Sequence, residues 1–243
     1  MTAARDHYER LLAPIYLWMA GGSEAAIAVG AQDLSALGIA PATDAAAVDL
    51  GAGFGMHSIP LARLGYAVTA IDSSAVLGAQ LLQLADALNV CVIEADLLEF
   101  SAHLDAAPAV ILCLGDTLTH LASAADVDRL CGSVAAALAP GGRFAATFRD
   151  YTSPAVGNAR FIPVRSDAER ILTCFLEAQP DRMLVHDILH ERQGGGWSMR
   201  VSSYPKLRLS PDDVVRTLER HGLAVRREPG PRGMTQIVAT RPS

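Results

Sequence analysis

A glycine-rich turn is the first place in the chain where residue types and spacing indicate chemistry. The segment Asp49–Gly55 reads DLGAGFG and follows an apolar stretch, Ala46–Leu50. Gly51 permits a tight turn, Gly53 leaves room for a ligand at the backbone, and Gly55 allows helix and strand to pack closely. Because the turn follows an expected strand and precedes an expected helix, it predicts a nucleotide-binding site. A glycine turn without a ligand is the alternative.

The spacing of these glycines bears on the kind of nucleotide. A dinucleotide fingerprint, GxGxxG, would place its third glycine at position 56, where this chain has Met56. The pattern is instead GxGxG, with Asp49 two residues before the first glycine. Asp72 ends the segment AVTAID, and an acidic residue at that place in nucleotide-binding folds accepts hydrogen bonds from ribose hydroxyls.

The elements that must position these residues alternate between strands and helices. We expect strands at 46–50, 66–71, 90–94, 109–114 and 143–148, and helices at 56–64, 75–88 and 124–138. Such alternation predicts a parallel sheet with helices on both faces. Two helices come before it, one at 5–20 that is broken or kinked near Pro14 and one at 24–37.

The rhythm changes after residue 148. Strand-like segments at 160–165, 171–178, 182–192 and 197–209 predict an antiparallel insertion. Ser210 and the acidic residues after it predict the start of a helix that runs to about residue 221. A final antiparallel strand pair follows at 223–227 and 234–240.

The GxGxG pattern and this order of elements resemble the class I S-adenosylmethionine-dependent methyltransferases. The resemblance covers residues 46–149, and residues 210–241 add the last helix and closing strand pair of that family. It implies S-adenosylmethionine as cofactor, with Asp72 at the ribose, Asp96 at the adenine amino group and the segment CLG at the methionyl end. The expected cofactor-binding residues are Asp49, Gly51, Ala52, Gly53, Gly55, His57, Asp72, Ser73, Asp96, Leu97, Cys113, Leu114 and Gly115.

The resemblance also implies the fold class and the division of the chain. We expect an α/β fold with a Rossmann-like, doubly wound, mostly parallel seven-stranded sheet whose last strand is antiparallel. The expected parts are an N-terminal helical cap (1–45), a cofactor-binding core (46–149), an antiparallel β insertion that binds the acceptor or forms a lid (150–209), and the last helix with the closing strand pair (210–243).

Two short segments point to the acceptor side. The segments CLGDTLTHL at 113–121 and FRDY at 148–151 are similar to glycine and sarcosine N-methyltransferases and related small-molecule enzymes, where they border the acceptor pocket. Those enzymes have an asparagine where this chain has Asp116, which counts against an amino-acid acceptor. The residues expected on the acceptor side are Asp116, Tyr151 and Tyr204.

Three residues are candidates for catalysis. His120 could act as a base, because an unperturbed imidazole titrates near neutrality. Arg149 could bind an acceptor carboxylate through its bidentate guanidinium. Tyr16 lies on the N-terminal helix, which often covers the cofactor in the family that the chain resembles. The structural alternatives are a backbone hydrogen bond for His120, an ion pair with a structural acid for Arg149, and helix packing for Tyr16.

Composition excludes several classes of protein. The chain has 243 residues, of which 51% are hydrophobic and 19% charged, so it is not intrinsically disordered. No apolar run approaches the ~18 residues of a membrane span, and the charged N-terminus lacks the apolar stretch of a signal peptide, which favours the cytoplasm. The four cysteines contain no CxxC pair, so we expect free thiols and no metal site.

Charge is distributed unevenly but forms no basic patch. Residues 1–140 hold 4 Arg against 15 Asp and Glu, a net of −11, whereas residues 141–243 have a net of +5. The proposed acceptor region, 150–209, has a net of only +1, and the sequence pI is about 5.6. Neither a nucleic acid nor a membrane is therefore expected as a partner. A homo-oligomer formed through the insertion is compatible with the sequence.

The sequence therefore predicts an S-adenosylmethionine-dependent enzyme that transfers a methyl group by in-line displacement to an N or O atom of a small molecule. Such an enzyme must align the nucleophile and exclude water. One alternative is an NAD(P)-dependent oxidoreductase, against which the missing third glycine counts. The other is a protein that binds S-adenosylmethionine without turnover.

Overall fold

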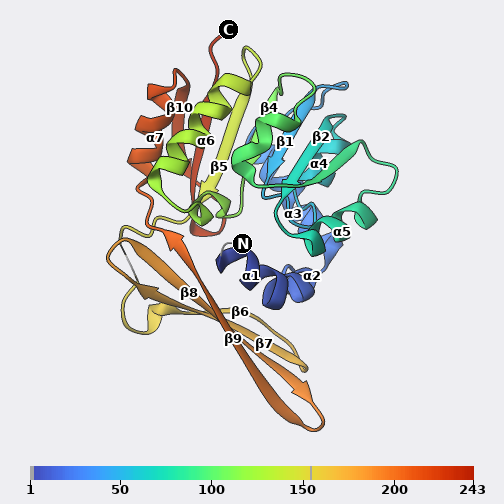
Figure 1. The fold of residues 1–243 in the computed structure, drawn as a ribbon. Helices are drawn as coiled ribbons and strands as arrows, with labels where there is room; N and C mark the ends of the chain where they lie inside the picture. Colours follow the sequence, from blue (N-terminus) through green and yellow to red (C-terminus); the bar gives the residue numbers. More distant parts are fainter. Residues whose placement is uncertain (1–2, 154) are drawn as a thin grey trace.

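Two β-sheets and a helical N-terminal segment between them make up the protein (Figure 1). The structure is a computed structural model that describes residues 3–153 and 155–243. The larger sheet contains β1 (Ala46–Leu50), β2 (Ala67–Asp72), β3 (Val90–Glu94), β4 (Val110–Cys113), β5 (Arg143–Phe148), β10 (Ala224–Pro229) and β11 (Thr235–Thr240). The smaller sheet contains β6 (Phe161–Ser166), β7 (Arg170–Ala178), β8 (Arg182–Gln193) and β9 (Gly196–Leu207).

The larger sheet has seven strands in the order β10-β11-β5-β4-β1-β2-β3. Neighbouring strands among β1 to β5 pair in parallel, whereas β11 is antiparallel to both β5 and β10. All four residues of β4 are buried, as expected for a strand covered on both faces. The predicted fold class, including the antiparallel last strand, is confirmed.

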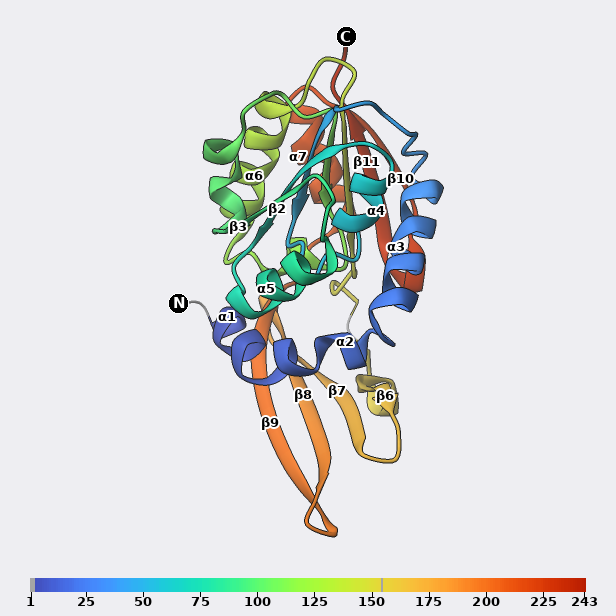
Figure 2. The same cartoon turned by 90° about the vertical axis from the view of Figure 1, so that its right-hand side faces the viewer.

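Helices cover both faces of this sheet (Figure 2). One face is covered by α3 (Ser23–Ala36), α4 (Ser58–Arg63) and α5 (Ala75–Leu84), and the other by α6 (Ala124–Ala137), α7 (Pro211–Arg220) and the 3-10 segment η3 (Leu97–His103). Leu34, Leu61 and Leu81 are buried on the first face, and Leu130 and Leu218 on the second. The carboxyl ends of the parallel strands are left for loops, which is where ligands bind in such sheets.

Local signals explain where several helices begin and end. The Ser74 and Ser123 side chains accept hydrogen bonds from backbone N–H groups at the starts of α5 and α6. Ser210 holds the expected position before α7, but its side chain makes no capping hydrogen bond. Helix α5 ends at Leu84, earlier than the predicted residue 88, and Ala87 takes a positive φ of 60° in the turn that follows.

The N-terminal segment is broken near Pro14 into short helical pieces, which is one of the two forms that the sequence predicts. It consists of α1 (Ala3–His7), a π-helical turn η1 (Tyr8–Leu12), a 3-10 turn η2 (Ala13–Ile15) and α2 (Tyr16–Met19). Pro14 lies within the 3-10 turn, where its missing N–H removes a helical hydrogen bond. These turns lie between the two sheets, and Leu11, Leu12 and Ile15 form a cluster with residues of the smaller sheet.

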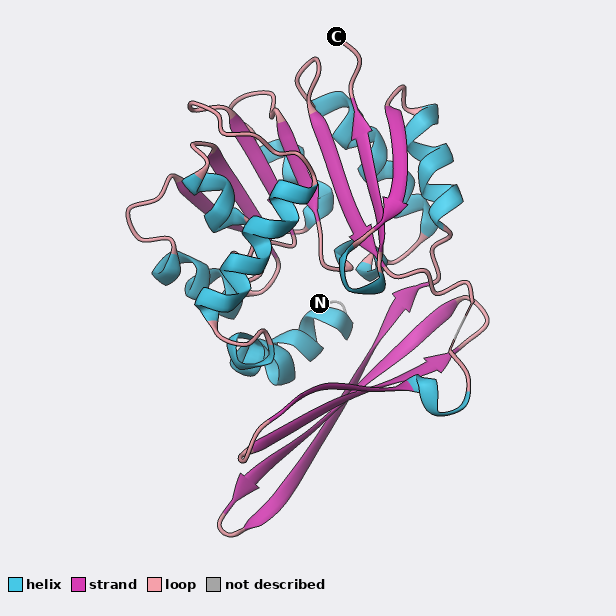
Figure 3. Ribbon diagram, turned by 180° about the vertical axis from the view of Figure 1, so that it is seen from behind, coloured by secondary structure: helices cyan, strands magenta, loops and turns pink. Residues whose placement is uncertain are grey.

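The predicted antiparallel insertion forms a twisted four-stranded sheet in the order β6-β7-β8-β9 (Figure 3). It projects from the core below the carboxyl ends of the parallel strands (Figure 1). No single helix in the described part of the chain is long and apolar enough to cross a membrane, although the bent pair Ala4–Met19 and Ser23–Ala36 together meets the length and composition criteria.

Candidate functional site

The glycine turn after β1 has the geometry of a ligand cradle. Gly51 has a φ of +73°, and a Cβ atom there would lie 2.5 Å from a Thr117 side-chain atom, so only glycine fits. A Cβ at Gly55 would lie 2.2 Å from Leu81 on α5. At Gly53, by contrast, the nearest atom to such a Cβ is 4.0 Å away, so the backbone of Gly53 borders open space.

Asp72, at the end of β2, is held by the turn itself. Its two carboxylate oxygens accept hydrogen bonds from the Gly53 and Ser74 backbone N–H groups, both at 2.8 Å. Burial raises the pKa of Asp72, and these two hydrogen bonds oppose the rise. Each carboxylate oxygen can accept a further hydrogen bond, so Asp72 can still accept hydrogen bonds from the two hydroxyl groups of a diol.

Asp49 and His57 lie deeper beneath the turn. Asp49 is 2% exposed and accepts a 2.6 Å hydrogen bond from the Ser58 hydroxyl, and burial raises its pKa. His57 directly precedes α4, but its side chain makes no capping hydrogen bond, and its Nε2 atom lies 3.2 Å from an Asp33 oxygen on α3. Arg232 also binds Asp33, at 2.8 Å, so His57 belongs to a contact that joins helix α3 to the closing strands.

The remaining predicted cofactor residues surround this turn. The Ala52 N–H donates a hydrogen bond to the backbone of β2, and Ser73 is exposed. Asp96 is exposed and accepts a 2.9 Å hydrogen bond from the Leu98 N–H at the start of η3, whose first residue is the half-buried Leu97.

The end of β4 combines a buried strand with an open turn. The Cys113 side chain is fully buried in the main hydrophobic cluster, and Leu114 is buried on the opposite face. Gly115 has a φ of +74°, and no atom lies within 4 Å of a Cβ placed there. Its N–H donates a 2.9 Å hydrogen bond to the Thr147 hydroxyl on β5, a partner that the sequence does not indicate.

Asp116 is the centre of a buried polar network. Its carboxylate accepts hydrogen bonds from the Arg149 backbone N–H at 2.9 Å and from the Tyr151 hydroxyl at 3.1 Å. It also forms an ion pair with Lys206 on β9. Asp116 and Lys206 are only 6% and 7% exposed, so the pair is shielded from solvent. The network joins the ends of β4 and β5 to the smaller sheet.

His120 lies in an aromatic enclosure on the 3-10 turn η4 (Thr117–His120). The Tyr204 ring stacks on it at 5.3 Å with an interplanar angle of 11°, and the Tyr8 ring meets it edge-on at 5.6 Å. Burial, together with electrostatic interactions with Lys206 and His7, lowers the pKa of His120 well below its ordinary value. The imidazole is therefore neutral at pH 7.

His7 and Asp187 pack against this enclosure, and the sequence analysis does not predict either of them as a site residue. They are 2% and 5% exposed and form a 2.9 Å hydrogen bond. The His7 ring also lies 4.3 Å from the Tyr204 ring. Because 180 positions separate the two residues, no local pattern indicates their contact. Lys206 is also absent from the predicted residues, although the sequence distinguishes it as the only lysine in the chain.

Tyr16 and Arg149, the other catalytic candidates, lie in different surroundings. The Tyr16 ring is 6.1 Å from Tyr8 and 5.7 Å from Phe54 in the glycine turn, and burial raises its pKa to about 12. Tyr8 thus connects Tyr16 to His120. The Arg149 guanidinium is half-buried and has no ion-pair partner among residues 3–153 and 155–243.

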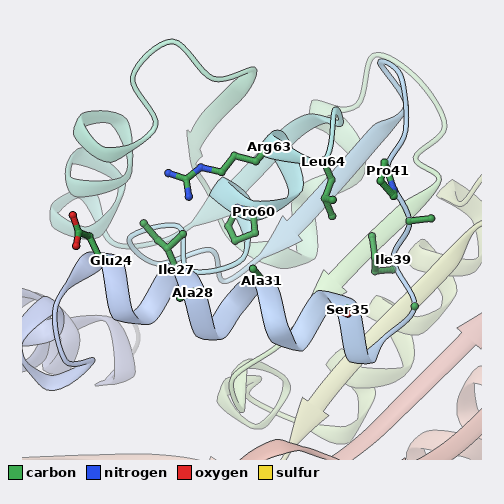
Figure 4. Close-up of a pocket in the computed structure, with 12 residues that line it drawn as sticks. Glu24, Ile27, Ala28, Ala31, Ser35, Ile39, Pro41, Pro60, Arg63 and Leu64 are labelled. Carbon is green, nitrogen blue, oxygen red and sulfur yellow. The ribbon is translucent and has the colours of Figure 1, made fainter.

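A separate groove of about 820 Å³ lies between α3 and α4 (Figure 4). Small and apolar side chains such as Ile27, Ala31 and Pro60 line it, with Glu24 and Arg63 at its rim. It contains none of the predicted site residues, so the candidate site remains at the carboxyl ends of the strands. No group of three metal-ligating side chains exists in the described part of the chain.

Comparison with known proteins agrees with this geometry. Residues 47–142 match a family model described as a methyltransferase domain. No curated protein matches the sequence. Among solved structures of similar fold, the CcbJ methyltransferase of Streptomyces caelestis has a TM-score of 0.78 and 20% sequence identity, over 97% of this chain and 98% of that one. CalS10, an amino pentose methyltransferase from Micromonospora echinaspora, has a TM-score of 0.75 and 17% identity, over 94% of this chain and 95% of that one. The sugar N-methyltransferase KedS8 from a Streptoalloteichus species has a TM-score of 0.70 and 15% identity, over 90% of this chain and 86% of that one.

These similarities confirm the expected resemblance at the level of domain and fold, and they do not favour the oxidoreductase alternative. The glycine turn, Asp72 and strands β2, β3 and β4 lie within the matched segment, and β1 begins one residue before it. Residues 47–142 are therefore similar to a methyltransferase domain, and the chain shares the fold of solved methyltransferases, one of which has S-adenosylmethionine bound.

Proposed function

We propose that the protein methylates an amino nitrogen of a small molecule with S-adenosylmethionine, and that the acceptor amine lies against His120. The cofactor side rests on the open space beside Gly53 and Gly115 and on the oriented carboxylate of Asp72. S-adenosylmethionine, when bound, supplies a methyl group on a sulfonium that is already activated for attack. Asp72 would hold the ribose hydroxyls, and Tyr16 would cover the nucleoside from the N-terminal segment.

The enclosure of His120 between the Tyr8 and Tyr204 rings, where burial lowers its pKa, carries the proposal. An imidazolium would add a second positive charge beside a sulfonium, whereas a neutral imidazole adds none. A neutral ring nitrogen also accepts a hydrogen bond from an amine N–H and can take up the proton that the nitrogen loses. The buried ion pair with Asp116 compensates the charge of Lys206 in the same region.

The aromatic enclosure favours an amine over an alcohol. The Tyr8 and Tyr204 rings flank His120, and aromatic faces attract the positive charge that develops on nitrogen as it is methylated. CalS10 and KedS8, which share this fold, are described as an amino pentose methyltransferase and a sugar N-methyltransferase. We therefore place an amino sugar or a similar polar amine first among candidate acceptors.

Ligand binding separates the cofactor classes. Thermal unfolding should be followed with S-adenosylhomocysteine, NAD and NADP at about 100 times their dissociation constants, where a specific ligand stabilises by about 2.7 kcal/mol. We expect stabilisation by S-adenosylhomocysteine alone. Stabilisation by NAD or NADP alone would contradict the proposed cofactor.

A turnover assay tests the acceptor and His120 together. Matched panels of amino sugars and the corresponding alcohols should be offered with S-adenosylmethionine, and methylated products identified by mass spectrometry. We expect N-methylated products, and His120→Asn should lower kcat by about 10²–10⁴-fold while S-adenosylhomocysteine binding persists. His103→Asn, on η3 away from the enclosure, is the matched control and should keep wild-type rates. Methylation of the alcohols alone would contradict an amine acceptor.

A further inference from the structure

Four rings pack together around His120, and one of them comes from a residue to which the proposed function gives no role. Tyr204 on β9 stacks on His120, with 5.3 Å between the ring centroids, and it also lies 4.3 Å from the His7 ring on α1. The Tyr8 ring meets each of these three rings edge-on, at 5.6–6.0 Å. The placement of His7 therefore bears on that of His120 through two tyrosine rings.

A buried hydrogen bond fixes the orientation of the His7 ring. Its Nε2 atom lies 2.9 Å from a carboxylate oxygen of Asp187 on β8, and both side chains are buried. Asp187 is held in the smaller sheet from both sides, because it is the register partner of Cys174 on β7 and of Ser202 on β9. A side chain on a strand paired at both edges holds its partner more precisely than a side chain on a loop.

Strand register brings this anchor and the Tyr204 ring to the same face of the smaller sheet. Tyr204 is the register partner of Val185, which lies two residues before Asp187 on β8. Because register partners and alternate residues of a strand share a face, Asp187 and Tyr204 project from the same side. The His7 ring thus contacts both, through a hydrogen bond to Asp187 and ring packing on Tyr204.

Stability alone does not account for the His7–Asp187 pair. The Nδ1 atom of His7 is buried and has no hydrogen-bond partner among residues 3–153 and 155–243. A buried polar atom without a partner destabilises a fold, whereas apolar side chains of similar size pack without this cost. An unsatisfied buried group of this kind therefore calls for a functional explanation.

We propose that His7 is a positioning residue for methyl transfer: anchored by Asp187, it holds the Tyr204 ring in the orientation that stacks on His120. The inference rests on the proposed function, in which the acceptor amine lies against His120. His7 acts through the other rings and not by contact with the acceptor. Misplacement of a reacting group by about 1 Å can cost about 10²-fold in rate, so support of this kind has a measurable effect.

Substitution of His7 by glutamine separates its hydrogen bond from its ring. In His7→Gln the amide can still donate to Asp187, so circular dichroism should show a folded chain, but no ring is left beside Tyr204. We expect kcat for N-methylation to fall about 10- to 100-fold. The KM for the amine and the dissociation constant of S-adenosylhomocysteine should change less than about threefold, because the ring contributes to orientation and not to binding.

A second variant and a control complete the set. Asp187→Leu replaces the anchor by an apolar side chain of similar size, and it should lower kcat in the same way. The matched control is His186→Gln, since His186 also pairs with a carboxylate at 2.9 Å, that of Glu177. It is the neighbour of Asp187 in the chain, so its side chain projects from the opposite face of the sheet, and kcat should stay at the wild-type value.

Proton NMR of the histidine rings tests the inference without an acceptor. The stacked Tyr204 ring shields the His120 ring protons, whose signals are identified by their loss in His120→Asn. These signals should move or broaden in His7→Gln and stay in place in His186→Gln. Unchanged His120 signals in His7→Gln would overturn the inference, as would a wild-type kcat in either folded variant, His7→Gln or Asp187→Leu. Methylation of alcohols alone would instead contradict the proposed acceptor, and the spectra would still decide the role of His7.

Discussion

Burial controls the charge of the residues that matter most at the site. Burial raises the pKa values of Asp49 and Asp72 and lowers that of His120, so each group is shifted toward its neutral form. Backbone hydrogen bonds oppose the shift at both carboxyl groups, as does the Ser58 hydroxyl at Asp49, whereas electrostatic interactions with Lys206 and His7 reinforce it at His120. The candidate site thus combines hydrogen-bonded carboxyl groups beside the glycine turn with an uncharged ring in the aromatic enclosure.

The lowered pKa of His120 predicts a pH dependence of stability. Below its ordinary pKa of 6.5 and above its folded pKa, the unfolded chain binds a proton that the native protein does not. The free energy of unfolding therefore falls as pH decreases through this window, by at most about 1.4 kcal/mol per pH unit. In denaturant titrations at several pH values, His120→Asn should show a smaller fall than wild type, with His103→Asn as control. An unchanged slope in His120→Asn would contradict the assignment.

The open space at Gly53 predicts a separation of binding from folding. Gly53→Trp should abolish the binding of S-adenosylhomocysteine, because the new side chain fills the space in which the ligand would lie. The positive φ of 56° adds some strain, but the position borders solvent, so circular dichroism should still show a folded chain. Titration calorimetry measures the binding. Wild-type affinity in the variant would place the cofactor elsewhere.

Among the elements, β9 links the aromatic enclosure around His120 to the larger sheet. Its Lys206 pairs with Asp116 at the end of β4, and two residues earlier its Tyr204 stacks on His120. Since alternate residues of a strand share a face, both contacts depend on the same register of β9. A shift of β9 would therefore displace the aromatic enclosure as well as the ion pair.

Removal of one partner of this ion pair should be strongly destabilising. Asp116→Asn and Lys206→Met each leave the other charge buried without its partner, at a cost of about 3–5 kcal/mol. The double variant should lose less than the sum of the two, and denaturant unfolding measures this coupling. Arg216→Met, which breaks the exposed pair with Asp213, should change stability little. Strictly additive losses at the buried pair would contradict the coupling.

Local pattern was enough to predict the regular elements and the cofactor turn. Strands β1, β3 and β5 have the predicted bounds, because short apolar runs between glycine and polar turns specify buried strands. The 3-10 segments η3 and η4 were not predicted, since they lack the periodicity of a longer helix. The contacts of His7 with Asp187 and of Asp116 with Lys206 could not be predicted, because they arise only when two distant parts of the chain pack together.

At the scale of the whole molecule, the N-terminal segment holds the two sheets together. Its residues contribute to one cluster with Leu172 and Leu189 of the smaller sheet and to another with Phe54 and Leu77 beside the glycine turn. The irregular π-helical and 3-10 turns bring side chains onto both sides of a short segment. The glycine turn, the aromatic enclosure and the smaller sheet are therefore parts of one packed unit.

A substitution in this segment should loosen the smaller sheet first. Leu12 is 3% exposed in the cluster with Leu172 and Leu189, and Leu12→Ala should cost about 2–5 kcal/mol by leaving a cavity. In hydrogen-exchange measurements, amides of β7 and β8 should exchange faster in the variant, while those of β1 and β4 change less. Leu82→Ala, at an exposed position, is the control. Uniform acceleration in all strands would contradict a local effect.

The burial of Lys206 makes its reaction with acylating reagents a measure of how often the two sheets separate. Because the chain has no other lysine, its only side-chain amine lies at the contact between the two sheets, where it is 7% exposed and paired with a carboxylate. Apart from the α-amino group, an acylating reagent therefore finds no accessible amine in the native protein. The rate at which Lys206 becomes acylated should measure how often the sheets separate, and a bound cofactor analogue should slow it.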